Sequence, residues 1–146
     1  MALKRRHIRL VVLAVVLSLA VPLLAYLRDP PWLLATASGF RGWEQGTDGT
    51  RFRWMGGHAS FFVSANAHTV ELPVRTSLVG EDWPITLSVS IDDRPADRIV
   101  LADGEWHSIM LRLPPPGRRR VRRVDIRLDR TRDEDHGAAI GEPRIQ

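Results

Sequence analysis

The chain has 146 residues, which is room for one domain of ordinary size. Hydrophobic residues make up 44% and charged residues 26%, close to globular averages, so the composition excludes a wholly disordered chain. Of 21 basic residues, four precede the apolar segment described next, and the remaining 17 balance the 17 acidic ones. This neutrality argues against a nucleic-acid-binding protein. Cysteine is absent, which excludes a disulfide framework, a zinc–thiolate site and a cysteine nucleophile.

The first predicted element is a transmembrane helix over residues 10–27, a segment without a charged residue. As a helix it would be about 27 Å long, close to the thickness of a bilayer core, and Pro22 is tolerated in such a helix. Residues 1–9 contain a basic cluster made of Lys4, Arg5, Arg6, His7 and Arg9. The positive-inside rule therefore places residues 1–9 in the cytoplasm and the rest of the chain outside, with the helix in an inner (cytoplasmic) membrane.

A cleaved signal peptide is the alternative interpretation of this segment, because Ala35-Thr36-Ala37 resembles a small-residue cleavage site. The apolar run, however, exceeds the ~7–15 residues usual for the apolar region of a signal peptide. The small residues also lie beyond a charged pair and two prolines. We therefore interpret residues 10–27 as a retained signal anchor, while cleavage stays open as the second possibility.

Residues 28–38 form a linker, and after it the apolar residues alternate with polar ones, which is typical of β-strands. The clearest case places Val124, Ile126 and Leu128 on one face of a strand. Strands are predicted around residues 51–54, 59–63, 70–75, 85–91, 99–101, 109–113, 124–128 and 139–145. Turn residues, including Asp92-Asp93, separate them. Residues 39–146 are therefore predicted to be all-β, a single β-sandwich or jelly roll of about 7–8 strands preceded by one transmembrane helix.

A set of short motifs then resembles a known family. They are Gly39-Phe40, Trp43-Glu44, Phe52-Arg53-Trp54, Gly56 to Ala59, Gly104 with Trp106, Leu113-Pro114 and Asp135. They resemble β-sandwich domains attached to bacterial membrane glycosyltransferases and related cell-envelope proteins, from Gly39 to the C-terminus. Met55 stands where threonine is usual in that family. The resemblance implies a jelly-roll domain similar to carbohydrate-binding modules, serving envelope polysaccharide work without catalysis by this domain.

Three tryptophans are candidate glycan-binding residues, because an aromatic ring stacks on the apolar face of a sugar. Trp43, Trp83 and Trp106 lie in or beside predicted turns, where a ligand would reach them. The alternative is that these rings cap the ends of the sandwich core. Trp54, in phase with Phe52, is predicted to be a core residue.

Charged residues form three further groups with a candidate structural or binding role. Glu44 and Arg53 are predicted to form a structural ion pair that fixes the register of two segments. Asp133 and Asp135 are a weak calcium candidate, against which a solvated loop is favoured, so neither a metal nor a cofactor is predicted. The run Arg118–Arg123 is predicted to be a charged edge or hairpin that resists aggregation, with binding to anionic lipid or acidic polysaccharide as the alternative. No aromatic residues alternate with these arginines to stack bases.

The common catalytic motifs are absent from the sequence, and no enzymatic activity is predicted. The predicted function is that of a single-pass, membrane-anchored accessory or binding module in cell-envelope polysaccharide assembly. Its partners would be the bilayer, through residues 10–27, and a glycan or a membrane glycosyltransferase complex. One alternative is a structural subunit that binds a partner protein by a strand edge or aromatic patch. The other is a small glycan hydrolase with two carboxylates in a cleft.

Overall fold

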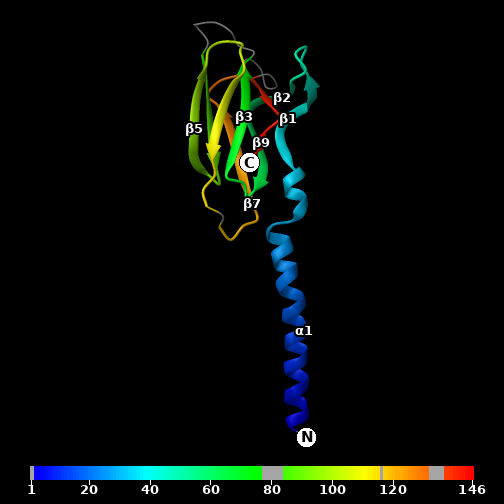
Figure 1. The fold of residues 1–146 in the computed structure, drawn as a ribbon. Coiled ribbons are helices and arrows are strands. Elements are labelled where there is room, and N and C mark those ends of the chain that lie inside the picture. Colours follow the sequence, from blue (N-terminus) through cyan, green and yellow to red (C-terminus); the bar gives the residue numbers. More distant parts are fainter. Residues whose placement is uncertain (1, 77–83, 116, 132–136) are drawn as a thin grey trace. The chain divides into compact units, whose positions relative to one another are not determined.

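The computed structural model describes residues 2–76, 84–115, 117–131 and 137–146 (Figure 1). Trp83, Asp133 and Asp135 therefore lie outside the described residues. The chain divides into two compact units, residues 1–33 and residues 34–146.

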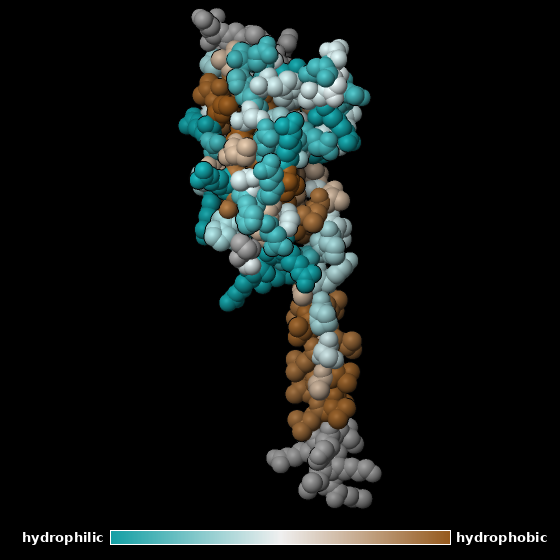
Figure 2. All heavy atoms as spheres, viewed as in Figure 1, coloured by the Kyte–Doolittle hydropathy of each residue, from teal (hydrophilic) through white to brown (hydrophobic). Residues whose placement is uncertain are grey.

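The first unit is the helix α1 (Ala2–Arg28), which is long and apolar enough to cross a membrane. Its large apolar side chains from Leu10 to Leu27 are exposed, and Figure 2 shows a mostly hydrophobic surface along the helix. The helix ends because Pro30 and Pro31 lack the backbone N–H that would continue it. A short 3-10 helix, η1 (Pro31–Ala35), follows. The prediction of one apolar N-terminal helix is thus confirmed, and the orientation of its ends stays a prediction.

The second unit is an all-β domain, as predicted. Its strands are β1 (Ala37–Gln45), β2 (Arg51–Ser64), β3 (Thr69–Thr76), β4 (Ile85–Ile91), β5 (Arg94–Leu101), β6 (His107–Arg112), β7 (Val121–Leu128), β8 (Ala138–Gly141) and β9 (Arg144–Ile145). The strands pair in the order β5-β4-β7-β2-β8-β3-β6, with β1 added to β2 and β9 to β3. All the pairings are antiparallel. The sheet curls on itself and encloses one core (Figure 1).

The strand β2 belongs to both layers of the sandwich. Its first half pairs with β8, from Phe52 opposite Gly141 to Met55 opposite Ala138. Its second half pairs with β7, beginning at His58. The core residues of the two halves share one phase, with Met55 in the first half and Ala59, Phe61 and Val63 in the second, and two consecutive glycines stand at the junction. One long strand therefore connects the two layers without a loop.

The core is almost entirely aliphatic. Its largest fully buried side chains are Met55, Val63, Val70, Leu72, Val74, Ile85, Leu87, Val89, Leu101, Leu111, Val124 and Ile126. Phe61 is the aromatic residue of the core, and Phe40 packs against it at 6.5 Å between ring centroids. The prediction that Trp54 belongs to the core is wrong. Met55 shares the phase of Ala59 and Phe61 and takes the core position, whereas Trp54 is half-buried on the other face of β2, where its ring packs against that of Phe52.

Gly39 is a position where the backbone requires glycine. Its φ is +74°, in the left-handed region, and an added Cβ would lie 2.1 Å from the carbonyl oxygen of His58. The register between β1 and β2 shifts just after Ser38. Gly39 thus lets β1 approach β2 more closely than any other residue would allow.

The arginine run does not form a sheet edge. Val121, Arg122 and Arg123 belong to β7, which pairs with β2 on one side and with β4 on the other. Arg118 to Arg120 precede it in the β6–β7 loop. The prediction that this run protects an edge is therefore wrong, because β7 is an interior strand. The outer strand on this side is β5, in which six of the eight residues are exposed.

Candidate functional site

Trp43 lies on β1 and is 39% exposed, but two arginines already contact its ring. The guanidinium carbons of Arg51 and Arg53 are 4.4 Å and 4.3 Å from the ring centroid. A sugar stacking on this ring would compete with these cation–π contacts. Burial lowers the pKa of Arg53, and the charge of neighbouring Arg51 lowers it further. In this structure Trp43 is therefore part of a packed aromatic–arginine cluster.

Trp106 is half-buried on a different face. Its ring centroid is 5.9 Å from that of Phe52, and the guanidinium carbon of Arg75 lies 4.8 Å from it. Its indole Nε1 is buried and has no hydrogen-bond partner among the described residues. Phe52 and Arg53 are successive residues of β2 and project to opposite faces. The structure therefore does not bring Trp43 and Trp106 together into one binding platform.

The structure also separates Glu44 from Arg53. Glu44 lies opposite Phe52, whereas Arg53 lies opposite Trp43, so the two charged side chains leave opposite faces of the β1–β2 ribbon. Glu44 instead accepts a hydrogen bond from the indole Nε1 of Trp54 at 3.3 Å. Within the described residues these two side chains form no ion pair. An ion pair between them therefore does not set the register of β1 against β2, which shifts at two places along β1.

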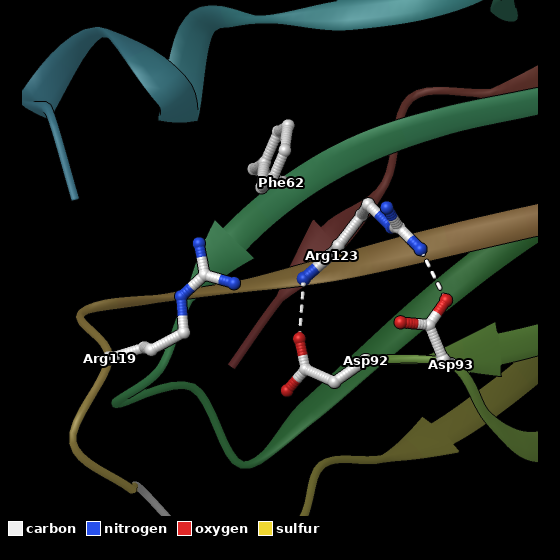
Figure 3. A pocket seen from close by; sticks show the side chains of 5 residues that line it. All are labelled: Phe62, Asp92, Asp93, Arg119 and Arg123. Carbon is white, nitrogen blue, oxygen red and sulfur yellow. Dashed lines mark hydrogen bonds and ion pairs between the residues drawn. The ribbon is translucent and has the colours of Figure 1, made fainter. Parts of the chain in front are cut away.

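A different aromatic residue, Phe62, lies in a hollow of the domain surface (Figure 3). Along β2 it alternates with Ser60 and Ser64 on the face away from the core, while Phe61 and Val63 face inward. The hollow has a volume of about 390 Å³, and its other lining residues are Asp92, Asp93, Arg119 and Arg123. In the described part of the chain, no guanidinium group and no second ring lies over Phe62.

The wall of the hollow is the turn between β4 and β5. Asp92 and Asp93 have φ values of 49° and 66°, which is the geometry of a two-residue hairpin turn with both residues left-handed. The turn is held against β7 by two hydrogen bonds. The backbone N–H of Asp92 donates to the carbonyl of Arg123 at 2.9 Å, and the N–H of Arg123 donates to the Asp92 carboxylate at 3.1 Å. Arg122 adds an ion pair to the same carboxylate at 2.8 Å. The predicted turn is confirmed.

Arg123 is fixed in place as the opposite wall. Its Nε donates to the buried Asp125 carboxylate at 2.7 Å, and a terminal nitrogen pairs with Asp93. The hydrogen bond to Asp125 and the charge of that carboxylate raise the pKa of Arg123, so its guanidinium is charged at every physiological pH. His58 lies 3.2 Å from the other oxygen of Asp125. The hollow therefore presents a fixed positive group beside an aromatic ring.

A second hollow, of about 420 Å³, continues this polar surface across β7 and β4. It shares Asp93 with the first, and its other polar lining includes Ser88, Ser90, Asp97, Asp125 and Arg127. Both hollows lie on outward positions of strands whose alternate residues form the core. The outer face of the layer β5-β4-β7-β2 is thus a continuous polar surface with Phe62 at one side.

Sequence reasoning missed Phe62, although a signal was present. The predicted strand over residues 59–63 assigns Ala59, Phe61 and Val63 to the core and leaves Phe62 among outward positions. An aromatic residue between two outward serines has no packing role in such a strand. That mismatch between residue type and predicted face is a reason to consider Phe62 as a ligand contact.

We expect Asp93→Gly to stabilise the domain while weakening any ligand held in the Phe62 hollow. Asp93 is 82% exposed, so its ion pair with Arg123 is a surface pair and contributes little. Glycine removes the cost of a left-handed φ, which we estimate at about 0.5–1 kcal/mol. Denaturant unfolding of the purified chain, followed by tryptophan fluorescence, measures the gain. A loss of stability would show that the ion pair outweighs the backbone strain.

No protein-family model and no curated protein matches this chain. Among solved structures it is similar to the EclA C-terminal domain, a sugar-binding protein, at 15% identity and a TM-score of 0.49, covering 72% of this chain and 90% of that one. It is also similar to a family 35 carbohydrate-binding module from an environmental isolate, at 16% identity and a TM-score of 0.47, covering 74% and 86%. A family two carbohydrate esterase from Clostridium thermocellum in complex with cellohexaose has a TM-score of 0.49 at 6% identity, covering 76% of this chain and 31% of the esterase.

The first two of these solved structures are thus a sugar-binding protein and a carbohydrate-binding module. This chain spans less than a third of the length of the esterase. Attachment to a glycosyltransferase, an envelope location and the role of a protein-interaction subunit all stay predictions, as does the small-hydrolase alternative.

Proposed function

We propose that the β-domain binds a glycan, and that the Phe62 hollow is the binding site. The observation that carries this proposal is an aromatic ring framed by charged donors and acceptors, with no guanidinium stacked on it in the described residues. A sugar ring has apolar C–H faces that stack on an aromatic ring, and hydroxyls around its rim that both donate and accept. Arg119 and Arg123 supply donors there, and Asp92 and Asp93 supply acceptors.

The size and rigidity of the hollow support the same proposal. About 390 Å³ lies in the range of small-molecule sites and is room for one or two sugar rings. Arg123 and Asp92 are held by hydrogen bonds to each other, and Arg123 is also held by the buried Asp125, so little freedom is lost on binding. The neighbouring hollow that shares Asp93 would take further sugar units.

The finer parts of the proposal rest on the sequence resemblance and on α1. We propose that α1 anchors the domain at a bacterial inner membrane, with the domain on the extracytoplasmic side. There it would serve as an accessory module in envelope polysaccharide assembly, alone or beside a membrane glycosyltransferase. The exposed apolar surface of α1 supports the anchor, because such a surface is stable only against lipid or another protein.

Phe62→Ala is the variant that tests the site. We expect it to weaken binding of envelope-type oligosaccharides by about 30-fold or more, as expected when an aromatic hot spot of roughly 2 kcal/mol is removed. Phe62→Tyr, which keeps the ring, is expected to retain binding. The measurement is calorimetric titration of the full chain in detergent micelles against a panel of neutral and acidic oligosaccharides.

Trp43→Ala and Trp106→Ala are the matched controls, since each also removes one aromatic ring. We expect both to bind as the parent chain does, because arginines already stack on these rings. If the tryptophan variants lost binding while Phe62→Ala kept it, the site would lie at the tryptophans and the proposal would be wrong. A folded chain with no response to any glycan would reject glycan binding altogether.

A further inference from the structure

Basic residues gather at one end of the β-domain, which we call the arginine end. Three connections meet there: the β2–β3 turn, the β4–β5 turn and the β6–β7 loop. Backbone hydrogen bonds tie them together, from Ala65 N–H to the Arg120 carbonyl and from Leu113 N–H to the His68 carbonyl, each at 2.9 Å. The exposed arginines of this end are Arg94, Arg112, Arg118, Arg119 and Arg120.

The acidic residues of these connections do not cancel that charge. They are Asp92 and Asp93, and both are ion-paired to the additional arginines Arg122 and Arg123. At the opposite end, residues 102–106 and 129–131 carry three acidic residues and one arginine. The domain is close to neutral as a whole, but its positive charge is concentrated at one end, where it creates a local attractive field for anions.

The chain enters the domain at this same end. Ala37, the first residue of β1, lies opposite Phe61, which is three residues before β2 ends at Ser64. Residues 29–36 connect α1 to Ala37, and even fully extended they span no more than about 30 Å. The covalent connection to α1 therefore starts from the arginine end, which lies nearer along the chain to any bilayer that α1 crosses than the acidic end does.

The arginine end also contains a hollow of about 430 Å³ suited to a lipid headgroup region. Arg94 and Arg112 line it together with the apolar Ile91, Leu113 and Pro114. Guanidinium groups bind phosphate oxygens through paired hydrogen bonds, and the apolar lining suits the glycerol and acyl carbons next to a phosphate. One site thus combines the two chemistries of the bilayer interface.

We infer that the arginine end docks on an anionic phospholipid bilayer, the same membrane that α1 crosses. Docking of this kind fixes which way the domain faces and leaves the acidic end toward the aqueous phase. The inference needs α1 to span the bilayer but does not depend on glycan binding, so the two proposals fail separately. Each arginine near an anionic surface strengthens docking by about fivefold.

The test uses the absence of cysteine in the chain, which lets one introduced cysteine carry a label. Gly117→Cys places it in the β6–β7 loop, where an added Cβ meets no atom closer than 4.0 Å. Ala102→Cys places it on an exposed residue at the opposite end. The full chain is reconstituted into vesicles of neutral phosphatidylcholine or of phosphatidylcholine with 30% phosphatidylglycerol. Fluorescence quenching by lipid-bound quenchers then reports the depth of each label.

We expect the label at residue 117 to be quenched in anionic vesicles, less in neutral vesicles, and less again in high salt, which screens the charges. Quenching of the label at residue 102 is expected to change neither with the charge of the lipid nor with the salt concentration. Arg94→Gln, Arg112→Gln and Arg118→Gln together should reduce the docking equilibrium by roughly a hundredfold. The matched control neutralises Arg41, Arg51 and Arg130, which lie outside the arginine end, and should leave docking unchanged. Equal quenching at residue 117 in both vesicle types, or equal effects of the two triple variants, would overturn the inference.

Discussion

Gly39→Ala is expected to destabilise the β-domain by about 2–5 kcal/mol, the sum of a left-handed backbone penalty and the cost of forcing strands apart. The Cβ of alanine would lie 2.1 Å from the His58 carbonyl oxygen and 2.8 Å from the Cα of Ala59. Both are backbone atoms, which cannot move aside as the end of a flexible side chain can. The pairing of β1 with β2 must therefore shift to accommodate a single methyl group.

Denaturant unfolding of the full chain in micelles, followed by tryptophan fluorescence, measures this loss. Gly42→Ala is the matched control on the same strand, since no atom lies within 4 Å of its added Cβ and its φ is not left-handed. We expect the control to change stability by less than about 0.5 kcal/mol. If the two variants unfolded at the same denaturant concentration, the close approach of β1 to β2 described above would be incorrect.

Met55→Thr has the second largest expected effect, a loss of about 2–4 kcal/mol from a cavity and a buried hydroxyl. Met55 is fully buried where β2 passes from one layer to the other, and its carbonyl accepts a hydrogen bond from Gly137 at 2.8 Å. Threonine is the usual residue at this position in the family that the sequence resembles. Met55→Thr thus introduces the residue that is usual in that family, and we nevertheless expect it to destabilise this core.

Met55→Leu is the control for that variant, because it keeps the apolar volume and should cost less than about 1.5 kcal/mol. The same unfolding measurement compares both. An equal, small effect of threonine and leucine would mean that the space around Met55 collapses freely, contrary to the close packing of the two layers there.

The strands were predictable because a sheet with one buried face imposes a period of two on its sequence. Val124, Ile126 and Leu128 on β7 follow that rule, as do Ile85 to Ile91 on β4, although β4 also buries Thr86. The rule was less informative at the start of β2. There Phe52 is buried although its face of the strand lies away from the core cluster, and Trp54 shares that face. Two large aromatic residues therefore indicated the wrong face, and the core position belongs to Met55, in phase with Ala59 and Phe61.

The candidate site was less predictable, because it joins residues from three separate parts of the chain. Phe62, Asp93 and Arg119 become neighbours only through the pairing of β2 and β4 with β7. Composition favoured tryptophan as the stacking residue, yet arginines from the paired strands contact the rings of Trp43 and Trp106. Cross-strand partners are properties of the sheet, and they decide which rings are available to a ligand.

The outer strand β5 becomes important when many copies of the domain are held close together on one surface. Anchored copies of a domain are confined to two dimensions, where they collide far more often than the same number in solution. An open strand edge would then pair with its neighbours. Arg94, Pro95 and Arg98 on β5, together with the register shift between β4 and β5 near Val89, make that edge charged and irregular. If α1 anchors the domain as proposed, many copies can therefore share one patch of membrane without joining their sheets.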